Sequence, residues 1–138
     1  LLVPAPAAAC SNGITIPADS NANTRDLDAV HVIDTYGNGL GNFGFAVGNN
    51  GRALRYTGAA WVEDNPPAGT PRLRGVYVLS AAQVWAVGSN GAIRRWQSGT
   101  WTSFASPTGE NLNSVYMLDT NGDGLADDGW AVGDEDGN

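Results

Sequence analysis

The chain has 138 residues, the length of one ordinary domain, and 42% of them are hydrophobic, which is enough to bury a core. The formal net charge is −7 and every cationic residue is an arginine. An acidic chain argues against nucleic acid as a partner, because phosphate binding needs excess positive charge. No run of about 18 apolar residues exists, so the sequence predicts no membrane span.

The opening stretch, "LLVPAPAAAC", has two interpretations. An apolar start followed by small residues resembles the end of a signal peptide, and residues 7–10 resemble a lipoprotein cleavage site. A charged n-region and most of the apolar h-region are missing, so we favour ordered structure. Cys10 is the single cysteine, which excludes an intrachain disulfide and argues against a metal or redox role.

Short apolar runs separated by turn residues predict an all-β fold. The chain contains 19 glycines, and Gly, Asn, Asp, Thr and Ser cluster between the runs. No long apolar stripe has the 3.6-residue period of a helix. This profile is typical of many short strands joined by tight turns.

Three stretches, beginning at Leu27, Leu73 and Leu112, share one pattern. Each reads Leu-x-x-Val, an alternating strand, a loop, and then an aromatic-Ala-Val-Gly strand. In the first two copies a Gly turn, a further strand, a second Gly turn and a final strand with Trp follow. The landmarks of these two copies lie about forty residues apart.

A repeat of about forty residues with four strands is the signature of a β-propeller blade. In the second copy we expect strands near 75–79, 84–87, 92–96 and 101–104. The aromatic-Ala-Val strands should be covered on both faces, and the Trp of the last strand should pack between adjacent blades. A β-sandwich with coincidental similarity is the alternative, and the fidelity of the repeat argues against it.

The predicted organisation is blade repeats at 27–72 and 73–111, and the inner half of a third blade at 112–138. Residues 1–26 contain two short apolar stretches, which we interpret as N-terminal strands that complete the third blade of the same or another chain. Pairing between chains would produce a six-bladed ring or an open filament. A window on a longer chain and a disordered leader are the alternatives.

Two motifs carry a resemblance to known families. "VWAVGSNGAIRRWQSGTW" resembles the tandem propeller repeats of many secreted bacterial proteins, and "LDTNGDGLADDGWAVG" resembles the integrin-type FG-GAP calcium-loop repeat. The resemblance extends from about residue 27 to residue 133. It implies a propeller fold but leaves the function open, since propellers serve adhesion, lectin, scaffold and enzyme roles.

The loop "DTNGDGLADD" is predicted to bind Ca²⁺, a hard cation that prefers six to eight oxygen ligands. The bidentate Glu of an EF-hand is absent, because Trp130 stands at the twelfth position. This departure fits the integrin-type loop, and a solvated polar turn is the alternative. The predicted ligands are the side chains of Asp119, Asn121, Asp123 and Asp127 and the carbonyl oxygen of Leu125.

The loop of the first copy, "DTYGNGLGNF", is a degenerate version of the same motif. Asp34 is kept, but Asn38 and Asn42 replace two aspartates. One carboxylate provides little field for a divalent cation, so we expect weak metal binding or none at this second loop.

No catalytic residue is predicted. His31 stands where the other copies have tyrosine, which favours a structural role, and no nucleophile with a partner base is visible. Sugar binding in a pocket between blades is the rival function, by Trp stacking with Arg hydrogen bonds. Its candidate residues are Trp61, Trp96, Trp101, Arg55 and Arg95, although their strand positions favour a core role for the tryptophans.

The sequence therefore predicts an extracellular or cell-surface module, stabilised by Ca²⁺, with a structural or adhesive role and no enzymatic activity. Self-association head to tail through the N-terminal strands would produce a homo-oligomer or polymer. A lectin-like propeller that binds glycans is the alternative.

Overall fold

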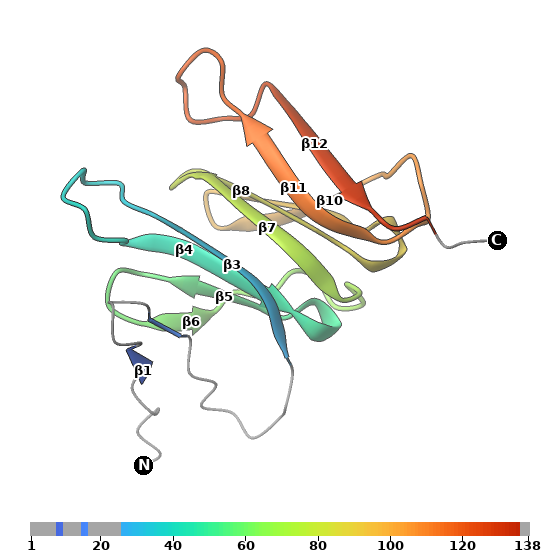
Figure 1. Ribbon diagram of the computed structural model, residues 1–138, viewed down its shortest axis with the longest axis horizontal. Coiled ribbons are helices and arrows are strands. Elements are labelled where there is room, and N and C mark those ends of the chain that lie inside the picture. The colour runs from blue at the N-terminus through green and yellow to red at the C-terminus, as the bar shows by residue number, and fades with distance from the viewer. Residues whose placement is uncertain (1–7, 10–14, 17–25, 136–138) are drawn as a thin grey trace.

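The computed structural model describes residues 8–9, 15–16 and 26–135, and its regular structure is antiparallel β apart from two short 3₁₀ turns (Figure 1). The all-β class predicted from the sequence is confirmed. Within the described residues no helix has the length and apolar character needed to cross a membrane.

Each of the first two repeats folds into a four-stranded antiparallel sheet in which consecutive strands pair. The strands of the second sheet lie within about two residues of the predicted bounds. The first sheet consists of β3 (Leu27–Ile33), β4 (Phe43–Gly48), β5 (Ala53–Tyr56) and β6 (Trp61–Glu63). The second sheet consists of β7 (Leu73–Ser80), β8 (Gln83–Gly88), β9 (Ile93–Gln97) and β10 (Thr100–Phe104).

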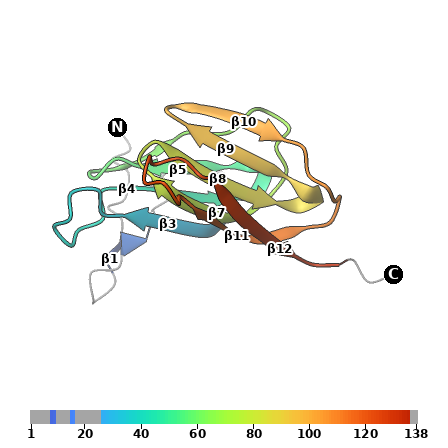
Figure 2. The ribbon, with the colours of Figure 1, turned by 90° about the horizontal axis from the view of Figure 1, so that it is seen from above.

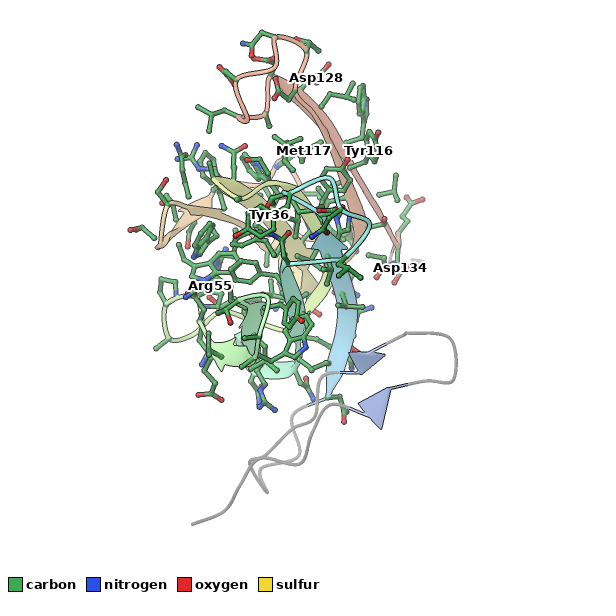
Figure 3. The ribbon with its side chains drawn as sticks, turned by 90° about the vertical axis from the view of Figure 1, so that its left-hand side faces the viewer. Tyr36, Arg55, Tyr116, Met117, Asp128 and Asp134 are labelled. Carbon is green, nitrogen blue, oxygen red and sulfur yellow. The ribbon has the colours of Figure 1, made fainter. Side chains whose placement is uncertain are left out.

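The third repeat forms a two-stranded sheet of β11 (Leu112–Leu118) and β12 (Asp128–Gly133). The N-terminal strands β1 (Ala8–Ala9) and β2 (Thr15–Ile16) pair with each other in a separate sheet. They lie beyond the first sheet, on the side away from the second, so this chain does not place them beside β12 (Figures 1 and 3). Completion of the third sheet by another chain stays a prediction.

The three sheets share one strand register, which establishes that the repeats are structurally equivalent. In each sheet the register shifts at a bulge just after the opening leucine, between residues 27/29, 73/75 and 112/114. The aromatic residue of the second strand pairs with an aromatic ring or imidazole of the first. These pairs are His31–Phe45, Tyr77–Trp85 and Tyr116–Trp130.

The glycine that closes each aromatic-Ala-Val-Gly strand is required by a close backbone approach. A Cβ at Gly88 would collide with the carbonyl oxygen of Arg72, just before the opening leucine of the repeat. A Cβ at Gly48 would collide in the same way with the carbonyl oxygen of Asp26, and a Cβ at Gly133 with that of Asn111. A side chain at these positions would therefore force the first two strands apart.

Left-handed backbone conformations form the tight turns, as the Asn-Gly and Ser-Gly dipeptides predict. Asn90 has φ of 56° and Gly91 of 65° in the 3₁₀ turn Ser89–Gly91, and Asn50 repeats this conformation in Asn49–Gly51. Ser98 and Gly99 both have positive φ between β9 and β10, a two-residue hairpin turn.

The first strands of the three repeats, β3, β7 and β11, lie side by side (Figure 1). Seen from above, they run along one edge of the molecule, while β9 and β10 lie at the opposite edge (Figure 2). The described sheets form an open row rather than a closed ring.

The main core lies between the first and second sheets. Phe45 and Val84 are 0% exposed, and Trp96 is 5% exposed. Trp101, on the last strand of the second sheet, packs on Phe45 with 5.5 Å between ring centroids. Its Nε1 donates to the carbonyl oxygen of Asp64 in the first sheet at 2.8 Å. The prediction that the last-strand Trp packs between adjacent sheets is confirmed for Trp101.

The coverage of the three aromatic-Ala-Val strands differs. β4 and β8 are buried along nearly their whole length, as predicted. In β12 every residue except Gly129 is exposed, which contradicts the expectation for the third copy. The reason is that no sheet lies beyond β12 in the described part of the chain, so its outer face has no cover.

Candidate functional site

The loop between β11 and β12 is held by its own aspartates. The Asp119 carboxylate accepts hydrogen bonds from the backbone N–H of Gly122 at 2.6 Å and of Gly124 at 2.7 Å. Both glycines have positive φ, which lets the backbone wrap around that carboxylate. Asp123 Oδ1 accepts from the N–H of Leu125 at 2.8 Å, so successive turns are fixed by short polar side chains.

Asp127 closes this loop. Its Oδ2 accepts from the hydroxyl of Thr120 at 2.7 Å and from the Thr120 N–H at 2.8 Å. These two bonds hold the pKa of the Asp127 carboxyl below its usual value, so it is ionised at neutral pH. Asp128 lies at the base of the loop, where β12 begins (Figure 3).

The loop between β3 and β4 has the same hydrogen-bonding pattern with fewer charges. Asp34 accepts from the N–H groups of Tyr36, Gly37 and Gly39, which outweigh desolvation and lower its pKa. Asn38 accepts from the Leu40 N–H at 3.0 Å, as Asp123 does from Leu125. The amide of Asn38 therefore supports the same turn as the Asp123 carboxylate does.

Asn42 takes the place of Asp127 in the same way. Its Oδ1 accepts from the N–H of Thr35 at 2.8 Å, and its amide donates to the Thr35 hydroxyl at 2.6 Å. The first loop shows that the turn forms without carboxylates at these two positions. The charges of Asp123 and Asp127 are thus surplus to the needs of the backbone.

The donor set of loop 119–127 fits a hard cation in chemical type, since all five predicted ligands offer oxygen. Among the described residues, however, no three acidic, His or Cys side chains converge on one point. Both carboxylate oxygens of Asp119 are engaged with backbone N–H groups. Calcium binding by Asp119, Asn121, Asp123, Leu125 and Asp127 stays a prediction, as does its weakness at Asp34, Asn38 and Asn42.

Loop 119–127 also docks on the second sheet, a contact that the sequence analysis missed. The Ser80 hydroxyl donates to the carbonyl oxygen of Gly124 at 2.6 Å, and the N–H of Ala126 donates to Gln83 Oε1 at 2.8 Å. Gln83 is 3% exposed and also accepts from Trp85 Nε1 at 2.9 Å. A polar residue in the first position of a buried strand was the available signal.

A row of three rings crosses the first strands of the sheets. His31 and Tyr77 are 4.9 Å apart between ring centroids, and Tyr77 and Tyr116 are 4.8 Å apart. His31 Nδ1 accepts from the backbone N–H of Val78 at 2.9 Å, and burial lowers the pKa of the imidazole. This packing is what the structural interpretation of His31 requires. Cys10 lies outside the described residues.

The five candidate sugar-binding residues do not converge on one open site, although Trp96 and Trp101 are cross-strand partners that both pack on Phe45. Trp96 is buried in the core, and Trp101 packs between sheets. Arg55 pairs with Asp64 at 2.8 Å, and the guanidinium of Arg95 lies over the Phe104 ring at 4.7 Å. Trp61 lines a groove on the first sheet that it shares with Tyr56.

No family model, curated protein or solved structure matches this chain.

Proposed function

We propose that the chain is an extracellular, calcium-stabilised β-propeller-repeat module with a structural or adhesive role, which associates head to tail with further copies. The observation that carries this proposal is the recurrence of one inter-sheet contact, from His31 to Tyr77 and from Tyr77 to Tyr116. Equivalent positions meet at each step, so each sheet is added to the last by nearly the same movement, as blades are in a propeller.

Blade number supports association between copies. Propellers usually have four to eight blades, and the described residues form two full sheets and the inner half of a third. Two copies would supply six blades if the N-terminal strands complete each half, and an unclosed series would grow into a filament. The outer edge of β12 has no paired strand in the described part of the chain, and β1 and β2 of a neighbouring copy are the strands we propose for it.

Calcium supports the same role. In loop 119–127 the surplus charges of Asp123 and Asp127 repel each other and Asp119 unless a cation offsets them. A calcium ion bound by these carboxylates and the Leu125 carbonyl oxygen would fix the loop that docks on Ser80 and Gln83. Millimolar calcium outside cells suits such a short, exposed site, which is why we place the module there.

The test is negative-stain electron microscopy with light scattering on the full chain in calcium buffer. We expect small rings or filaments. A Thr15→Pro variant, which removes a donor from β2, should reduce assembly without changing the far-ultraviolet spectrum. A strictly monomeric chain at every concentration would contradict the proposal.

A carbohydrate-binding propeller is the second candidate, favoured by the exposed aromatic groove at Tyr56 and Trp61. A glycan array would reveal binding that Trp61→Ala abolishes, because sugar rings stack on the indole. Absence of binding across a broad array would remove this candidate.

A further inference from the structure

The two end sheets expose faces that are covered elsewhere in the row. On the third sheet, Trp130 is 55% exposed and Val132 is 64% exposed. Their equivalents in the first sheet, Phe45 and Val47, are both 0% exposed, because the second sheet covers them. The face of β11 and β12 therefore carries the residues that elsewhere form an inter-sheet core.

The first sheet exposes its other face, the one equivalent to the face with which the second sheet packs on the first. A groove of about 600 Å³ is lined by Val30, Val32, Leu40, Tyr56 and Trp61. The second sheet has Val76, Val78, Trp96 and Trp101 at the positions of Val30, Val32, Tyr56 and Trp61, and it packs these four side chains against the first sheet. The groove thus corresponds in position to the surface with which the second sheet packs on the first.

The contact inside the chain defines how the two free faces would fit. Phe45 packs on Trp96 at 5.3 Å and on Trp101 at 5.5 Å between ring centroids. Trp130 is the equivalent of Phe45, and Tyr56 and Trp61 are the equivalents of Trp96 and Trp101. An indole entering the groove would reproduce this aromatic contact of the existing core.

We propose that the exposed face of β11 and β12 in one copy docks into the groove of the first sheet in a second copy, with Trp130 packed against the neighbouring rings of Tyr56 and Trp61. Tyr116 of the first copy then stacks on His31 of the second, which continues the row of rings. This inference rests on the proposed head-to-tail module and identifies its contact surface.

The loop between β3 and β4 agrees with this interface. Leu40 is 69% exposed, whereas its equivalent in the third repeat, Leu125, is partly buried. Leu125 stands between the two residues, Gly124 and Ala126, that bond to the second sheet. No four-stranded sheet covers Leu40 in the described part of the chain, and the third sheet of another copy would provide that cover.

The position of the N-terminal strands also agrees with the proposed interface. β1 and β2 lie beyond the first sheet, on the side of its free face (Figures 1 and 3). A third sheet docked there would have its unpaired β12 edge near these strands. Face docking and strand donation would then be two parts of one interface.

The experiment uses three full-length variants in sedimentation velocity. Trp130→Asp places a charge on the third-sheet face, and Val30→Asp places one in the groove. Val62→Asp is the matched control, because Val62 is also a partly exposed strand valine but lies outside both faces. Near-identical circular dichroism spectra would show that each variant is folded.

We expect Trp130→Asp and Val30→Asp each to weaken self-association at least about 30-fold, the loss typical of an aromatic hot spot, and Val62→Asp to behave as the unchanged chain. An equimolar mixture of the two face variants should form a heterodimer and stop there, because one intact face of each kind remains.

Association of both face variants at the unchanged concentration would overturn the docking faces while leaving the head-to-tail module intact through other surfaces. An unchanged chain that stays monomeric would overturn both. Equal loss in Val62→Asp would show a general charge effect and would also count against the faces.

Discussion

Gln83 links two repeats through a single side-chain oxygen. Its Oε1 accepts from Trp85 Nε1 within the second sheet and from the Ala126 N–H of loop 119–127. Replacing Gln83 with leucine would leave both donors without this acceptor, so we expect a loss of about 1–3 kcal/mol in the free energy of unfolding. Urea unfolding monitored by Trp fluorescence measures the change.

The matched control is Gln97→Leu, at the residue paired with Gln83 across β8 and β9. Gln97 is partly buried, and its side chain has no hydrogen bond to another repeat within residues 26–135. We expect less than about 0.5 kcal/mol for this change, as for ordinary surface substitutions. Equal losses in the two variants would show that the effect comes from the glutamine position in the sheet and not from the bridge.

His31 makes stability depend on pH. Burial lowers its pKa below the usual 6.5, and its Nδ1 must be unprotonated to accept the Val78 N–H. The unfolded chain therefore takes up a proton at a higher pH than the folded chain. This contribution to stability is complete above pH 6.5 and falls as the pH drops towards the folded pKa.

His31→Asn tests this, because the asparagine oxygen can accept the same N–H but does not titrate. We expect the melting temperature of the unchanged chain to decrease from pH 7 to pH 5 more than that of the variant, measured by circular dichroism. Parallel curves would mean that other groups cause the acid sensitivity.

At the scale of strands and loops, the sequence predicted the strands that recur in each copy. It did not predict features that depend on whether a neighbouring sheet is present. The aromatic-Ala-Val-Gly strands were predictable, because their sequence recurs in each copy. The structure repeats with it: each copy has a β-bulge after its opening leucine and a close backbone approach at its closing glycine. The exposure of β12 was not, because Trp130 and Phe45 have the same local pattern and differ only in whether a sheet covers them. The docking of Ala126 on Gln83 joins residues far apart in sequence, so spacing gave no sign of it.

The two β-hairpin loops supply an internal test for calcium. Asp123→Asn converts loop 119–127 towards loop 34–42, where Asn38 supports the same turn without charge. We expect calcium to raise the melting temperature of the unchanged chain. At a hundredfold excess of calcium over the dissociation constant, the free energy of unfolding should increase by about 2.7 kcal/mol. Asp123→Asn should abolish this rise.

Asn38→Asp is the control for this experiment. It adds one carboxylate to the first loop but leaves Asn42 without charge, so it should add little calcium response. Calcium-free melting should be nearly unchanged or slightly improved in Asp123→Asn, since one repulsion is removed and the turn is kept. A calcium response that survives in Asp123→Asn would disprove the assignment of this loop.

At the scale of the whole molecule, the described residues form an open row of sheets, and in our proposal its two ends dock on each other between copies. Within the row, Arg72 of the second sheet forms an ion pair with Asp28 of the first. At a junction between copies the equivalent positions hold Asp26 and Asn113, so no ion pair is available there. The proposed junction would therefore depend on apolar contact, and two chains of charge −7 repel each other.

Salt should therefore strengthen self-association. At about 0.1 M ionic strength the screening length is about 10 Å, and it shortens to about 3 Å at 1 M, which weakens repulsion between copies but leaves the burial of Trp130 unaffected. We expect the dissociation constant from sedimentation equilibrium to decrease as sodium chloride rises, in calcium-free buffer so that loop charge is constant. Ion pairs at the junction would produce the reverse trend, because screening would then remove attraction. The direction of the salt effect thus separates an apolar junction between sheet faces from one held by charge.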